Sequence, residues 1–180
     1  IEEIEIQYLT FTDLVNKYVN IASRSAGFIK KLFNLKLSAN LSDESLEHIK
    51  FGQDLAPKIA QSYENRSFSS AMRAIMQFAD HANQYIDQHQ PWVLAKSEDE
   101  SERAKVQEIC TVAINDFRLM SIYLKPVIPN IISKVEAFLQ VDAFVWDDCK
   151  NLLLDHEIAK FKPLLGRVAS EDVANFLEGE

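Results

Sequence analysis

The chain has 180 residues and a net charge of −8, and 47% of its residues are hydrophobic. That length is enough for one domain with a sizeable core. Only 4 glycines and 5 prolines are present, which favours long helices over a turn-rich β fold. No run approaches the ~18 consecutive apolar residues of a membrane span. The negative charge argues against broad electrostatic binding of nucleic acid.

Positive charge is concentrated near the N-terminus. Residues 11–36 carry five basic side chains and one acid, a local charge of +4 that leaves −12 for the rest of the chain. The basic residues are Lys17, Arg24, Lys30, Lys31 and Lys36. A locally basic helix on an acidic body is typical of a protein that recognises one specific RNA, rather than one that coats RNA at large.

Residues 11–34 are predicted to form the first helix, because apolar residues recur at spacings of three, four and seven. Its apolar positions are Phe11, Val15, Tyr18, Ala22, Ile29 and Phe33, and Thr10 or Thr12 is expected to cap its start. A neighbouring face carries Asn16, Asn20, Arg24, Gly27 and Lys31.

Gly27 is unusual inside a helix, where glycine costs about 1 kcal/mol relative to alanine. Close packing against another helix is the favoured explanation, and room for the backbone of a ligand is the alternative.

Residues 43–64 are predicted to form the second helix, with Ser42 as its cap, Ser45 as an alternative cap, and a kink at Pro57. Its apolar positions are Leu46, Ile49, Phe51, Leu55, Ile59 and Tyr63. The third helix is predicted over 67–88, with a core face of Phe68, Met72, Ile75, Ala79, Ala82 and Ile86. It should end before Pro91, since the residue before a proline is pushed out of α geometry.

A charged connector is predicted at 96–103, and its last residues belong to a fourth helix at 101–124. A fifth helix is predicted at 131–138. The apolar positions of the fourth helix are Val106, Ile109, Ala113, Phe117, Met120 and Leu124. The expected fold is an all-α antiparallel bundle of about five helices over 1–140. An irregular C-terminal tail over 141–180, with a short helix at 171–177, is expected to pack back on the bundle.

The cysteines and histidines do not suggest a metal site. Cys110 and Cys149 lie far apart in sequence, no CxxC is present, and the histidines lack metal-ligand spacing. Cys110 falls in a helical apolar run, where a small buried thiol is the ordinary interpretation. Reduced thiols suit a cytoplasmic protein. No catalytic residue is predicted in this chain.

Three side chains could together hold an unpaired base. Asn20 and Arg24 are four residues apart on one helix face, and Trp92 follows the end of a long helix at Pro91. An amide and a guanidinium can hydrogen-bond a base while an indole stacks on it, which is how single-stranded RNA loops are read. Each residue alone is ordinary, and Trp92 alone is more typical of packing.

Four blocks of the sequence resemble the anticodon-binding domain of bacterial methionyl-tRNA synthetase. The first is Asp13-Leu14-Val15-Asn16-Lys17 followed by Val19-Asn20-Ile21-Ala22-Ser23-Arg24-Ser25-Ala26-Gly27-Phe28-Ile29. The second joins Ala82-Asn83-Gln84-Tyr85-Ile86 to Gln90-Pro91-Trp92-Val93-Leu94-Ala95-Lys96. The third is Tyr123-Leu124-Lys125-Pro126-Val127-Ile128-Pro129, and the fourth joins Leu154-Asp155-His156-Glu157-Ile158 to Phe161-Lys162-Pro163-Leu164. They occur in order over nearly the whole chain.

The resemblance implies a helical bundle that reads the methionine anticodon, CAU. Asn20 and Arg24 match residues that contact the anticodon bases, and Trp92 matches the tryptophan that stacks with the first base. Asn16, Lys17 and Pro91 are expected to support the site, with Lys17 attracting phosphate. Asn83 and Tyr85 are expected to support it from behind.

The resemblance also implies partners and limits. The expected partners are the anticodon loop of methionine tRNA and the catalytic domain of the same polypeptide, with no DNA or membrane. The His-Ile-Gly-His and Lys-Met-Ser-Lys-Ser signatures are absent, so this chain is not expected to activate methionine. ATP, with zinc as a further candidate, belongs to the catalytic part of the parent enzyme.

Two alternatives remain open from the sequence. One is the anticodon domain of a related class I synthetase for isoleucine, valine, leucine or cysteine. The other is a helical protein-interaction module that never contacts RNA, for which the basic residues of the first helix would be dispensable.

Overall fold

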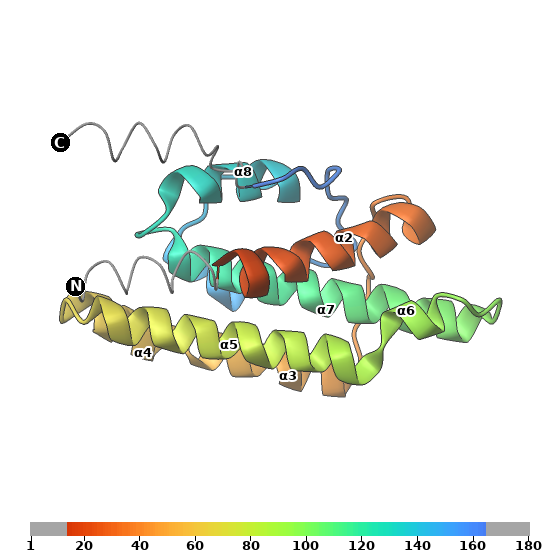
Figure 1. Cartoon of the computed structure of the whole chain (residues 1–180), viewed down its shortest axis with the longest axis horizontal. Coiled ribbons are helices and arrows are strands. Elements are labelled where there is room, and N and C mark those ends of the chain that lie inside the picture. The colour runs from red at the N-terminus through yellow and green to blue at the C-terminus, as the bar shows by residue number, and fades with distance from the viewer. Residues whose placement is uncertain (1–13, 165–180) are drawn as a thin grey trace, which may run out of the picture.

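The computed structural model describes residues 14–164, and within that range the chain is helical with no β-strand (Figure 1). The elements in chain order are η1 (Leu14–Val19), α2 (Asn20–Phe33), α3 (Asp43–Asp54), α4 (Ala56–Glu64), α5 (Phe68–His89), α6 (Pro91–Leu94), α7 (Glu100–Leu124), α8 (Pro129–Leu139) and η2 (Trp146–Lys150). The expected long helices correspond to α2, the α3–α4 pair, α5, α7 and α8. This confirms the all-α bundle.

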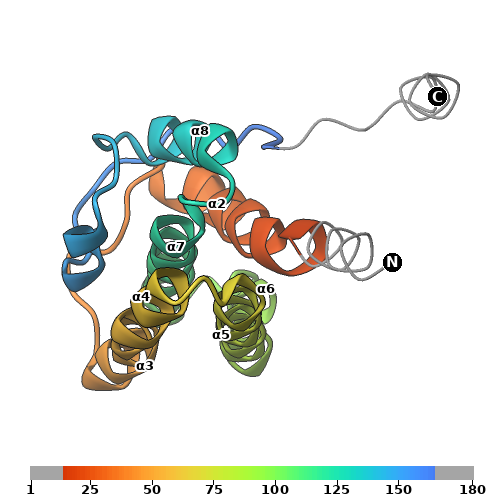
Figure 2. The same cartoon turned by 90° about the vertical axis from the view of Figure 1, so that its left-hand side faces the viewer.

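Helix α7 is the centre of the bundle. Figure 2 shows it surrounded by α2, α5, α8 and the α3–α4 pair. Every residue from Ile109 to Leu124 is buried. The six apolar positions predicted for this helix are all buried, and neighbouring elements cover the other side chains of its C-terminal half as well.

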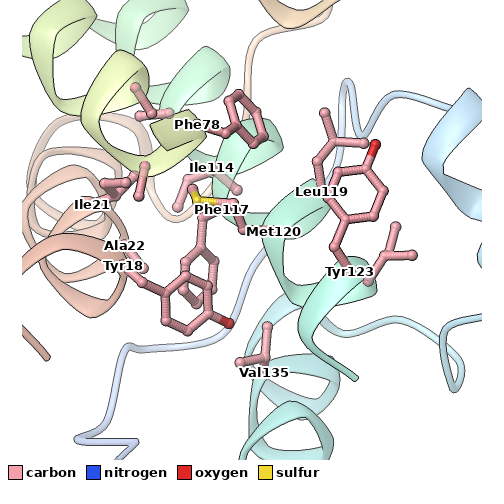
Figure 3. Packing of buried hydrophobic residues seen from close by; sticks show 14 of the residues in the cluster. Tyr18, Ile21, Ala22, Phe78, Ile114, Phe117, Leu119, Met120, Tyr123 and Val135 are labelled. Carbon is pink, nitrogen blue, oxygen red and sulfur yellow. The ribbon is translucent and has the colours of Figure 1, made fainter. Parts of the chain in front are cut away.

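Apolar side chains from several helices meet around α7 (Figure 3). Tyr18 and Phe117 stack with ring centroids 4.6 Å apart, which joins the start of the α2 region to the centre of α7. Ile21 and Phe78 are fully buried nearby. Burial of these side chains supplies the main driving force for the fold.

Polar residues of α7 bond to several neighbouring segments: η1, α3 and the segment after η2. Buried polar groups cost stability unless they are hydrogen-bonded. The pairs are Ser121 with the Tyr18 hydroxyl at 2.6 Å, Asp116 with His48 Nε2 at 2.8 Å, and Arg118 with the Asn151 carbonyl at 3.0 Å. Asn115 both donates to the Leu153 carbonyl and accepts from its N–H. These bonds select which segment packs on each side of α7.

The helix boundaries follow capping and proline chemistry. Ser42 caps α3 as predicted, since its hydroxyl accepts from the Ser45 N–H. The predicted second helix is divided at Leu55, because Pro57 has no N–H to donate and so suits the first turn of a new helix, α4. Helix α5 ends at His89 as predicted, but Pro91 then starts α6, which the sequence analysis missed.

The N-terminal part of the first predicted helix differs from expectation. Its described portion opens as the π-helical segment η1 before continuing as α2. The predicted caps Thr10 and Thr12, the apolar position Phe11 and the predicted helix at 171–177 lie outside the described residues.

Three of the apolar positions named from the sequence are exposed, and one of them, Phe68, was predicted for the core. Leu46, Phe51 and Phe68 show 40%, 45% and 56% of their surface to solvent. They lie on α3 and at the start of α5, where the outer side of the bundle has no covering helix. Phe51 still contacts a neighbour, since its ring centroid lies 4.3 Å from that of His81.

The segment after α8 packs against the end of α2 as an irregular strap. The Leu37 N–H donates to the His156 carbonyl at 2.8 Å, and the Ile158 N–H donates to the Leu35 carbonyl at 2.9 Å. Ile158 is fully buried. The predicted division into a bundle over 1–140 and a tail over 141–180 stays a prediction.

The two glycines within the described helices have opposite surroundings. Apart from its own turn of helix, a Cβ built on Gly27 would meet no atom of residues 14–164 within 4 Å, so the favoured explanation of close helix packing there is wrong. At Gly52 a Cβ would lie 2.7 and 2.8 Å from Cε2 and Cε1 of the buried Phe78 ring, with Cζ closer still. Gly52 is thus the position at which α3 has no room for a side chain.

The variant Gly52→Ala is expected to lower the free energy of unfolding by about 1–3 kcal/mol. The added methyl group overpacks the contact with Phe78, which is held inside the core. Urea denaturation of the parent chain and the variant measures the effect. A variant as stable as the parent would contradict this packing.

Candidate nucleic-acid interface

Segment η1, just ahead of α2, packs against the C-terminal half of α5, and polar side chains join these two segments. Asn83 Nδ2 on α5 donates to the Lys17 carbonyl at 3.3 Å and to the Ala79 carbonyl at 2.8 Å. One ion pair joins Lys17 Nζ to Asp80 at 3.0 Å, and another joins Arg24 to Asp87. The seam continues from α5 into α6, which carries Trp92.

Arg24 is the residue that connects α2 to α6. Its guanidinium carbon lies 5.0 Å from the ring centroid of Trp92, within the range of a cation–π contact. Its Nη2 lies 3.6 Å from Asp87 Oδ1, with the two side chains 43% and 62% exposed. An exposed ion pair contributes at most about 1 kcal/mol, so these contacts orient the guanidinium without fixing it permanently.

The indole of Trp92 is half-buried, with part of it packed against the core. Gln90 adopts a left-handed backbone (φ 44°) that ends α5, and buried Pro91 starts α6 immediately afterwards. This sharp turn places Trp92 beside α2 instead of continuing along α5. The ring is neither sunk in the interior nor separated from Arg24.

Asn20 lies on the same face of α2 as Arg24, one turn earlier, and is exposed. Its Nδ2 donates to the Asn16 carbonyl at 2.8 Å, which restrains the amide. Its oxygen Oδ1 has no hydrogen-bond partner among residues 14–164, so it remains available to accept from a ligand.

The predicted supporting residues have distinct places. Asn16 supplies its backbone carbonyl to Asn20, and Pro91 forms the buried start of α6. Lys17 is held beside Asp80, so a phosphate that approaches Lys17 must compete with that carboxylate. Tyr85 is buried and lies within 3.3 Å of the Ser45 hydroxyl, behind the seam. The phosphate-attracting role of Lys17 stays a prediction.

Sequence reasoning missed the two acidic residues of α5 that hold the cations. Asp80 and Asp87 are seven residues apart, so they fall on one helix face, with Asn83 between them. That spacing could have predicted the acidic partners from the sequence. The left-handed conformation of Gln90 could not be predicted, because glutamine is not typical of that geometry.

The described residues contain neither a candidate metal-binding cluster nor a candidate membrane span. Within residues 14–164, no three His, Cys, Asp or Glu side chains come together where they could hold a metal ion. In the same range, no helix has both the length and the apolarity to cross a membrane.

Replacing Arg24 should expose the Trp92 ring. In a Trp146→Phe background, where Trp92 is the sole tryptophan, Arg24→Ala is expected to increase quenching of tryptophan fluorescence by acrylamide, because the guanidinium no longer shields the ring. Lys31→Ala removes a neighbouring exposed cation of α2 and serves as the control. Equal quenching in the Arg24 variant and the control would contradict the stacked geometry.

The comparisons with known proteins agree on one family. The model of the anticodon-binding domain of methionyl tRNA ligase matches residues 41–175, a range that includes Trp92 but not Asn20 or Arg24. A methionine–tRNA ligase of Francisella tularensis is 45% identical over 167 residues, covering 93% of this chain. That of a Psychrobacter species is 44% identical over 180 residues, covering 96% of this chain.

The matches cover only part of these relatives. The chain spans 24% and 25% of the lengths of the two bacterial ligases. Among solved structures, methionyl-tRNA synthetase of Mycobacterium tuberculosis in complex with methionyl-adenylate superposes with a TM-score of 0.77 at 22% identity. That match covers 87% of this chain and 32% of the other, and supports the fold.

The family model and the relatives favour the methionyl family over the domain of another class I synthetase. The chain belongs to the family of anticodon-binding domains of methionyl-tRNA ligases.

Proposed function

We propose that this chain recognises the CAU anticodon loop of methionine tRNA, with Trp92 stacking on the first anticodon base and Asn20 and Arg24 bonding to base edges or phosphate. The observation that carries the proposal is the contact of the Arg24 guanidinium with the Trp92 ring, on the helix face where Asn20 presents an unbonded acceptor. Membership of the anticodon-binding family supports it.

Stacking is energetically feasible at the ring surface that Arg24 covers. A base that takes this place must displace the guanidinium, at a cost of about 0.5–1 kcal/mol for an exposed cation–π contact and at most about 1 kcal/mol for the Asp87 ion pair. Base–aromatic stacking contributes about 1–3 kcal/mol. The displaced guanidinium then has its donors free for a base carbonyl or a phosphate.

Asn20 accounts for the choice of base. Its restrained amide offers Oδ1 as an acceptor, and cytosine carries an exocyclic amino group that donates. Uracil presents a carbonyl at the same position, which would place two acceptors together. Stacking on Trp92 tolerates any base, so discrimination depends on this hydrogen bond.

We further propose that the protein containing this chain attaches methionine to its tRNA using ATP. This chain carries no His-Ile-Gly-His or Lys-Met-Ser-Lys-Ser signature. Its role is selection: it binds the anticodon loop so that the acceptor end reaches a catalytic domain of the same polypeptide.

Replacing Trp92 by alanine should weaken binding of an anticodon stem-loop RNA about 10- to 100-fold, because the stacking contribution is lost. Fluorescence anisotropy with a labelled CAU stem-loop measures the Kd of this chain and its variants. Trp92→Phe retains an aromatic ring, so its Kd should lie between those of the parent chain and of Trp92→Ala. Trp146→Phe, which changes the other tryptophan, is the control and should bind as the parent does. An unchanged Kd for Trp92→Ala would refute the proposal.

Asn20→Ala should reduce discrimination between CAU and UAU stem-loops about 10-fold, equivalent to about 1.4 kcal/mol, since one base-specific hydrogen bond is lost. The ratio of the two Kd values is the measurement, so a general loss of affinity does not affect the conclusion. Asn130→Ala, at an exposed position of α8, is the matched control. A ratio that stays the same in the Asn20 variant would show that another group selects the base.

A further inference from the structure

No contact within the described structure requires a glycine at position 27. It lies in the middle of α2, is exposed, and does not adopt the left-handed backbone that favours glycine. An added Cβ would meet open space, whereas at Gly52 it would strike the Phe78 ring. A residue that weakens its helix without helping to pack it indicates a functional constraint.

The position of Gly27 connects it to the proposed interface. It follows Arg24 by one turn and Asn20 by two, so all three share one face of α2. Lys31 lies one turn further along the same face. Arg24 and Lys31 are therefore about 10 Å apart along the helix axis, with bare backbone at Gly27 between them.

The cations beyond Gly27 are available to an anion. Lys30 and Lys31 are exposed, and neither forms an ion pair within residues 14–164. Lys17, Arg24 and Lys36 in the same region each have a carboxylate partner. Gly27 thus lies between a weakly paired guanidinium and two ammonium groups that have no ion-pair partner in the described part of the chain.

We propose that Gly27 is the point at which the sugar–phosphate backbone of the bound anticodon loop rests directly on α2. Without a side chain there, the backbone of the RNA approaches the helix closely enough for Arg24 and Lys31 to reach its phosphates from the two sides. Any larger side chain would hold the RNA away from both cations. This inference rests on the proposed function, since it uses the same face and the same ligand.

A size series at position 27 tests the inference. In the 180-residue chain, Gly27→Ala and Gly27→Gln should both raise Tm, by roughly a few degrees, because both residues favour helix and the space is open. The Kd for the CAU stem-loop should weaken about 10-fold or more in Gly27→Gln and less in Gly27→Ala. Ala137→Gln adds the same side chain at an exposed position of α8 and should bind as the parent does.

The outcomes separate this inference from the proposed function. Parent-like binding by Gly27→Gln together with weak binding by Trp92→Ala overturns the role of Gly27 and leaves the anticodon proposal intact. Parent-like binding by both variants overturns the role of Gly27 and the anticodon proposal together. A Gly27→Gln chain that unfolds below the parent Tm contradicts the open space on which the inference is built, and Gly27→Ala checks that premise with the smallest possible change.

Discussion

The contact between the Arg24 guanidinium and the Trp92 indole is the interaction on which the proposed site depends. It joins α2 to α6 across a wide separation in sequence and brings a planar set of donors to an aromatic surface. Neither group is strongly held: the indole is half-buried, and Arg24 pairs with an exposed carboxylate. An arrangement of weak, correctly placed contacts suits a site that must exchange them for contacts with a ligand.

The placement of that contact is determined by the rest of the bundle. Buried α7 fixes the surrounding helices through its polar side chains, among them Ser121 bonded to Tyr18 just ahead of α2. Asn83 then fastens the same region to α5. The left-handed turn at Gln90 and the proline after it direct Trp92 back towards Arg24. The buried interior of the bundle stabilises the fold, and the proposed recognition site lies on a seam at its surface.

The long helices could be predicted well from apolar spacing, from the Ser42 cap and from the prolines, because these signals act locally. The interior of α7 could not be predicted this way. Asn115, Asp116 and Arg118 are normally surface residues, and only their partners on distant segments explain their burial. The exposure of Leu46, Phe51 and Phe68 could not be predicted either, because apolar periodicity does not show which helix lies at the edge of the bundle. At the proposed site, Asn20, Arg24 and Trp92 were predicted from the order of the motifs in the sequence. The Arg24–Asp87 ion pair could not be predicted, because the two residues are distant in sequence and only the fold brings them together.

A crystal structure of this chain bound to a CAU anticodon stem-loop would test the account most directly. We expect the first anticodon base to lie on the Trp92 ring in place of the guanidinium, with its amino group within hydrogen-bonding distance of Asn20 Oδ1. A complex in which the loop binds another face while Arg24 still covers Trp92 would contradict the account.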